Sequence, residues 1–247
     1  MKHIALAAVA ATTFLISCNR VDYYQADSYV GRYDDLTKIT LVRNEGDAVC
    51  IDVKSDFDAQ GCYRPGDEKY RDLCRKHGDV GYNRKIAYLS GRDVVYNASD
   101  LLSVKVYSDR DFDAEHPAGS SLADIVRFLS CSPKEYIASG YKSMYSYDAA
   151  SLSEVFVTTW AYCYYWGRDA YECHPIDKML SDITPEDLVL LGPGLRSLPQ
   201  IYNGRFFSLA FVKKPSAEQV HEITVEITTE ERRIITGHLN VNFDDII

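Results

Sequence analysis

Alternation of polar and apolar residues recurs along the chain and predicts β-strands. Ile223, Val225 and Ile227 stand between polar residues, which is the period of a strand with one buried face. A polar, turn-forming segment separates the first two alternating stretches, so these are expected to form a hairpin. The segments with strand character are 37–42, 49–53, 86–96, 101–107, 206–212, 220–228 and 233–243.

Helical spacing is rarer in the sequence. One apolar series recurs at intervals of three and four and predicts a short amphipathic helix over one end of the sheet: Leu122, Ile125, Val126 and Leu129. Ser121 and Asp124 form a pair that resembles a capping box at the start of this helix. Residues 68–76 have room for one or two helical turns. Pro185 marks a helix start, although the residues after it suit a strand equally.

The first eighteen residues predict export and lipid attachment. Lys2 precedes an apolar run from Ile4 to Ile16, which is too short for a stable membrane span. Leu15-Ile16-Ser17-Cys18 has the pattern of a bacterial lipobox, in which the cysteine is acylated and becomes the mature N-terminus. The alternative is an ordinary secretory signal with a chance cysteine. We therefore expect Cys18 to attach the protein to a membrane through lipid.

Six cysteines remain after Cys18, and an even number in an exported chain predicts disulfide bonds. Local spacing suggests a bond between Cys163 and Cys173. It also suggests a pairing within Cys50, Cys62 and Cys74 that leaves one partner for Cys131. No spacing matches a zinc motif.

These features divide the chain into three parts. Residues 1–17 are a signal peptide, 18–36 an anchor and tether, and 37–247 a mainly β, antiparallel domain with one or two short helices. Polar or aromatic insertions, held by disulfides, are expected at about 54–85 and 131–175. The net charge of −9 and the lack of a basic stretch argue against nucleic acid as a partner and against basic docking to a membrane.

A resemblance adds to this picture. At Asp111-Phe112-Asp113, His116-Pro117-Ala118-Gly119 and Ser121-Leu122-Ala123-Asp124-Ile125 the chain resembles lipoproteins of unknown function from Bacteroidota, which carry an "FD…HPAGSSLND" loop. The resemblance covers roughly residues 99–247 and implies an immunoglobulin-like β-sandwich. It implies no activity. Residues 19–22 lack the acidic run of a surface-export signal in such bacteria, which favours the periplasmic face of the outer membrane.

The first candidate site is a set of alternating carboxylates, Asp109, Asp111 and Asp113, followed by Glu115. Carboxylates at this spacing can converge on Ca²⁺, which prefers six to eight oxygen ligands. The glycine and the bidentate glutamate of an EF-hand loop are missing. The alternative is a solvated loop whose aspartates cap turns. Apart from this calcium hypothesis, no cofactor is expected.

The second candidate site is aromatic. Tyr164, Tyr165, Trp166 and Tyr171 lie between Cys163 and Cys173, and such rings can stack on sugars or bind protein. The sequence lacks a nucleophile elbow, a zinc-protease motif and a phosphate-binding loop. We therefore expect a non-catalytic binding module with a glycan or an envelope protein as partner. The alternative is a glycan-acting enzyme or its accessory domain, because paired carboxylates have no spacing rule.

Overall fold

The computed structural model describes residues 23–44, 49–87, 95–142, 152–156, 173–192 and 205–244, without the side chains of 23, 56–60 and 86–87. Within these ranges the protein is mainly β, with antiparallel sheets and few helices, as the sequence predicts. The strands are β1 (Tyr23–Ala26), β2 (Arg32–Arg43), β3 (Cys50–Tyr63), β4 (Arg84–Ala87), β5 (Val95–Asn97), β6 (Leu101–Ser108), β7 (Val126–Ser132), β8 (His174–Met179), β9 (Arg205–Phe211), β10 (Val220–Thr229) and β11 (Ile234–Asn242). The helices are α2 (Glu68–Lys76), α3 (Lys134–Ala138), η3 (Leu180–Asp182) and η4 (Pro185–Leu188).

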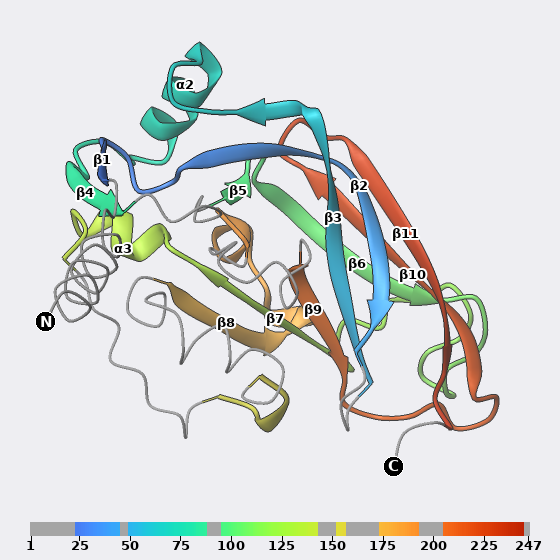
Figure 1. Ribbon diagram of the computed structural model, residues 1–247. Helices are drawn as coiled ribbons and strands as arrows, with labels where there is room; N and C mark the ends of the chain where they lie inside the picture. The colour runs from blue at the N-terminus through green and yellow to red at the C-terminus, as the bar shows by residue number, and fades with distance from the viewer. Residues whose placement is uncertain are drawn as a thin grey trace, which may run out of the picture.

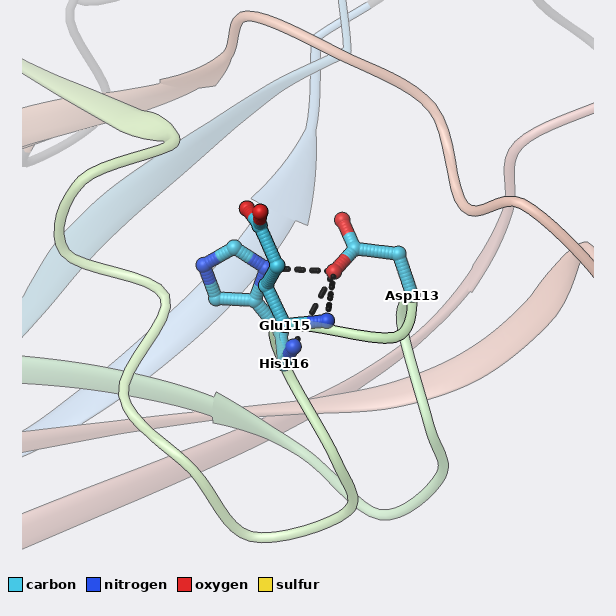
Figure 2. A group of neighbouring side chains, drawn as sticks. All are labelled: Asp113, Glu115 and His116. Atoms are coloured by element: carbon cyan, nitrogen blue, oxygen red, sulfur yellow. Dashed lines mark hydrogen bonds and ion pairs between the residues drawn. The ribbon is translucent and has the colours of Figure 1, made fainter.

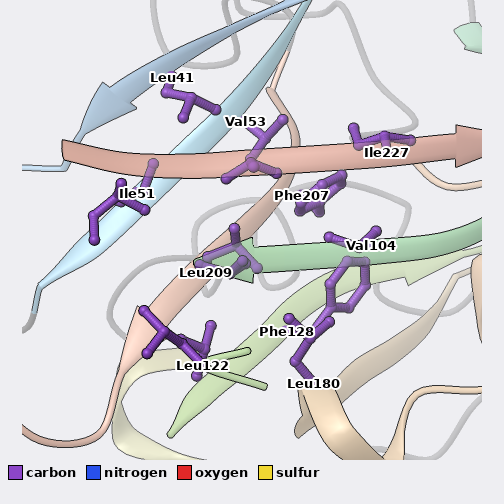
Figure 3. Packing of buried hydrophobic residues seen from close by; sticks show 14 of the residues in the cluster. Leu41, Ile51, Val53, Val104, Leu122, Phe128, Leu180, Phe207, Leu209 and Ile227 are labelled. Carbon is purple, nitrogen blue, oxygen red and sulfur yellow. The ribbon is translucent and has the colours of Figure 1, made fainter. Parts of the chain in front are cut away.

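Two sheets share the main hydrophobic core. The larger sheet has the strand order β5-β2-β3-β9-β7-β8, and the smaller has the order β11-β10-β6 (Figure 1). β1 and β4 form a separate ribbon. Val53, Phe128 and Phe207 of the larger sheet and Val104 and Ile227 of the smaller one belong to a single buried cluster (Figure 3). Along β10 the core residues Ile223, Val225 and Ile227 alternate with residues of the other face, as the period of two requires.

The predicted strands near both ends of the domain are confirmed. β2 and β3 pair in antiparallel fashion with Leu41 opposite Val53, as expected for a hairpin. The last three predicted strands are β9, β10 and β11. They do not form one sheet, because β9 lies between β3 and β7 in the larger sheet, whereas β10 and β11 lie in the smaller one. Consecutive strands thus cross from one sheet to the other.

The predicted helix over residues 122–129 is wrong. Residues from Val126 onward form β7, which pairs with β8 on one side and β9 on the other. Val126 and Phe128 lie in the main core, whereas Leu129 and Cys131 belong to another buried cluster. A strand that is buried on both faces has a nearly continuous apolar sequence, which periodicity cannot distinguish from a helix.

A second core, rich in tyrosine, holds the segment that the sequence marks as an insertion. α2 occupies the predicted range 68–76, and its buried side chains, Tyr70, Leu73 and Cys74, pack with Tyr29 and Tyr33. This corrects two boundaries. Residues 29–36 are part of the folded domain rather than a tether, and β3 continues to Tyr63 instead of ending near 54.

Asp79 is the polar centre of this tyrosine core. Its carboxylate is fully buried and accepts hydrogen bonds from the backbone N–H of Tyr29 at 2.7 Å, the N–H of Val30 at 2.8 Å and the hydroxyl of Tyr141 at 2.9 Å. Burial raises the pKa of Asp79, while these three donors oppose that change. Asp79 therefore links the chain after α2 to the chain before β2.

The cysteine predictions are wrong where the structure tests them. No disulfide joins any two of the described cysteines. Cys50 lies in a buried cluster with Cys131 and Cys173, whereas Cys74 lies in the tyrosine core. Cys62 on β3 forms no disulfide with either, so the expected pairing within the first three cysteines is not formed. Cys163 lies outside the described residues. The hydroxyl of Tyr96 lies 3.3 Å from the sulfur of Cys173. Packing, and not disulfide bonds, holds the described parts of both insertions.

Candidate functional site

The loop between β6 and β7, residues 109–125, carries a group of polar side chains that contact one another. It folds back on itself, because the N–H of Phe112 donates to the carbonyl of His116 at 2.8 Å and the N–H of Gly119 donates to Ser108 at 2.8 Å. Gly119 has φ +77°, a conformation that favours glycine. Phe112 anchors the loop in the core, where its ring lies 5.8 Å from that of Phe211.

The three aspartates of the calcium hypothesis point at three different places. Asp109 accepts a hydrogen bond from the N–H of Glu222 on β10 at 2.8 Å. Asp111 accepts from the N–H of Ala118 at 2.8 Å. Asp113 accepts from the N–H of Glu115 at 2.9 Å. Asp111 and Asp113 therefore cap turns of their own loop, as the alternative interpretation of the acidic pattern expects, whereas Asp109 fixes the loop to β10.

A different group of donor atoms is brought together at the centre of the loop. Asp113, Glu115 and His116 each offer one atom within 4.8 Å of the others (Figure 2). Carboxylates and an imidazole can hold a divalent cation. However, the ammonium of Lys213 already lies 2.7 Å from Asp113, so a cation would have to displace it. Lys213 holds the pKa of Asp113 far below its usual range, although burial opposes this.

His116 lies between two carboxylates. Its Nδ1 is 2.7 Å from Oδ1 of Asp113, and its Nε2 is 3.0 Å from Oδ1 and 3.2 Å from Oδ2 of Asp124. The side chain of His116 is only 6% exposed, whereas that of Asp124 is 63% exposed. Burial acts to lower the pKa of His116, but the hydrogen bonds to the two carboxylates outweigh it and raise that pKa. The sequence pattern emphasised the aspartates and missed this histidine.

Ser108 and His221 form a second arrangement that the sequence did not predict. Oγ of Ser108 lies 2.7 Å from Nδ1 of His221, and Nε2 of His221 lies 2.8 Å from the carbonyl of Glu218. A serine bonded to an oriented histidine has the geometry of a nucleophile and its base. Yet His221 is fully buried and Ser108 is 2% exposed. In this conformation the pair joins β6 to β10 and is closed to a substrate.

Two predicted sites lie outside the described residues. Cys18 and the aromatic candidates Tyr164, Tyr165, Trp166 and Tyr171 are among them. Of the aromatic region before that patch, Tyr136, Tyr141 and Phe156 are described. The two tyrosines are buried in the tyrosine core, and Phe156 is buried in the cluster with Cys131 and Cys173. Among the described residues, no helix is long and apolar enough to cross a membrane.

Comparisons with known proteins add no relative. No protein-family model, curated protein or solved structure matches this chain.

Proposed function

We propose that this protein is a lipid-anchored binding module of the bacterial cell envelope. The observation that carries the proposal is Leu15-Ile16-Ser17-Cys18, a lipobox-like tetrapeptide that directly follows an apolar signal segment. The β domain that follows would be held at the membrane by acyl chains on Cys18. We place it at the periplasmic face of the outer membrane, because residues 19–22 lack an acidic run.

The fold supports a binding role. We infer an immunoglobulin-like sandwich of the kind suggested by the resemblance to Bacteroidota lipoproteins. Antiparallel pairing and the crossing of β9 and β10 between two sheets with one core support this assignment. The pair Ser108 and His221 has structural hydrogen bonds and is buried, which favours binding over catalysis. A glycan or an envelope protein is the proposed partner.

Replacement of Cys18 by serine tests the anchor. The unaltered chain should appear in the membrane fraction with an acylated Cys18 at its N-terminus, as measured by mass spectrometry. Cys18→Ser should accumulate as an unprocessed precursor. The matched control, Cys62→Ser, should be processed normally, because this side chain lies on β3. Release of the unaltered protein into the soluble periplasmic fraction without detergent would contradict the proposal.

The partner is tested with the full-length, detergent-solubilised protein. Cosedimentation with isolated peptidoglycan sacculi would support a glycan partner. A reproducible crosslink to one envelope protein in intact cells would support a protein partner. If the anchored protein neither binds sacculi nor forms a specific crosslink, the binding role is refuted. The lipid attachment is not affected by that result.

A further inference from the structure

The protonation state of His116 follows from its hydrogen-bond geometry. Both ring nitrogens face carboxylate oxygens, at 2.7 Å for Asp113 and 3.0 Å for Asp124. Ionised carboxylates only accept hydrogen bonds, and a neutral imidazole has a single N–H to donate. A neutral ring would leave one nitrogen lone pair facing a carboxylate. Because the ring is only 6% exposed, water has little access to that nitrogen.

Both carboxylates are ionised, so they cannot supply the missing proton. Asp113 is bound by the ammonium of Lys213 at 2.7 Å and also accepts from the backbone N–H of Glu115 and His116. Hydrogen bonding to His116 outweighs burial and lowers the pKa of Asp124. The arrangement therefore requires an imidazolium between two carboxylates.

We propose that His116 is a pH-sensitive lock on the loop of residues 109–125. While the ring is charged, it binds Asp113 and Asp124 together and fixes the chain that leads into β7. Loss of the Nε2 proton to solvent base breaks the Asp124 contact, whereas Nδ1 keeps its proton and its bond to Asp113. The lock concerns the loop itself, so it goes beyond the proposed binding function.

The neighbouring charges determine which contact opens. The charged groups around His116 are Asp113, Glu115 and Asp124 on its own loop and Lys213 from the segment after β9. Asp113 has three further donors and stays in place. Asp124 is 63% exposed and can turn to water when the ring becomes neutral. Opening therefore begins at the Asp124 side, next to the start of β7.

The direction of the pH effect follows from the raised pKa of His116. The free histidine titrates near 6.5. The stabilising contribution is fully present below about pH 6.5 and is lost as the pH rises through the raised folded-state value. The loop is thus closed while the His116 ring is charged and both carboxylates are ionised, and it opens as the pH rises through the His116 midpoint.

His221 provides an internal reference in the same protein. Its Nε2 donates to the carbonyl of Glu218, and its Nδ1 accepts from the hydroxyl of Ser108. A neutral imidazole satisfies both bonds, and burial lowers the pKa of this ring. The pKa of His116 should therefore lie above the ordinary histidine value of about 6.5, and that of His221 below it.

Nuclear magnetic resonance of imidazole-labelled protein tests the lock. At about pH 6.5, the ordinary pKa of histidine, the His116 ring should be mainly doubly protonated and the His221 ring mainly neutral. Amide exchange in the loop, corrected for the intrinsic rate, should quicken above the His116 midpoint. Asp124→Asn should lower that midpoint by roughly one pH unit. Asp111→Asn, which removes the same charge from the same loop but only caps Ala118, should leave it nearly unchanged.

Three results would overturn the lock. One is a His116 ring that is mainly singly protonated at about pH 6.5. Another is an equal change of midpoint in the Asp124 and Asp111 variants, which would indicate a general charge effect. The third is loop exchange that does not follow the His116 titration. Asp124 is largely exposed, so its replacement should leave the fold intact for these measurements.

Discussion

Two polar segments of this protein, 64–83 and 109–125, look alike in sequence but are anchored by opposite physical means. Both are rich in aspartate. The first is fixed by Asp79, a buried carboxylate with neutral donors inside a tyrosine core. The second is fixed by His116, a charged ring between Asp113 and Asp124 near the surface.

The difference lies in what happens when an anchor is removed. Loss of the Asp79 carboxylate leaves several buried donors without acceptors, which lowers the free energy of unfolding at any pH. Loss of the His116 contacts exposes its partners to water, which solvates them readily. The first segment should therefore behave as part of the global fold, whereas the second should respond locally and with pH.

The largest effect is expected for Asp79→Ala. This variant leaves the N–H groups of Tyr29 and Val30 and the hydroxyl of Tyr141 without their acceptor, and should lose about 3 kcal/mol of unfolding free energy. Denaturant unfolding measures this. The control Asp72→Ala removes an exposed carboxylate of α2 and should change stability by under about 0.5 kcal/mol. Similar values for both variants would refute the buried anchor.

Replacement of single cysteines sharpens the contrast between packing and crosslinking. If a disulfide between Cys62 and Cys74 held the insertion, replacing either cysteine by alanine would lower the free energy of unfolding by the same amount, about 2 to 3 kcal/mol. The structure predicts unequal costs instead. Replacing the buried Cys74 should lower the free energy of unfolding by about 1 to 2 kcal/mol. Replacing the partly exposed Cys62 should lower it by under about 0.5 kcal/mol. If both variants lose the same free energy of unfolding, and the loss disappears under reducing conditions, the disulfide prediction would be supported instead.

A smaller, pH-dependent effect is expected for His116→Gln. At pH 6 the variant should be less stable than the unaltered chain by about 1 kcal/mol, because glutamine lacks the charge that binds both carboxylates. The difference should shrink as the pH rises to 9. Paired denaturation curves at several pH values cancel the contributions of other histidines. A difference that grows with pH would contradict the assigned charge.

The smallest effect is expected for calcium. Asp109, Asp111 and Asp113 each bond a backbone N–H, and Lys213 already neutralises Asp113. Melting temperatures with excess Ca²⁺ and with chelator should therefore agree. A rise with calcium that Asp113→Asn abolishes would show that the ion binds the folded state and displaces Lys213.

Local patterns correctly predicted the elements that are buried on one face only. β10 has one buried face, so Ile223, Val225 and Ile227 alternate with polar residues and the strand is evident. The pattern failed for β7, because both of its faces are buried, and for Tyr29 and Tyr33, whose polar hydroxyls and few aliphatic neighbours suggested a tether. Sequence thus indicates burial on one side of an element, but not burial on both.

The candidate site shows the same division. The sequence by itself determined that a polar, turn-rich loop follows β6 and that its aspartates suit backbone capping, since carboxylates accept backbone hydrogen bonds over short separations. Only the tertiary structure decided that His116 lies between Asp113 and Asp124, that Lys213 joins them, and that His221 meets Ser108. Those contacts join residues up to 113 positions apart, and their charges depend on burial and on partners that come together only when the chain folds.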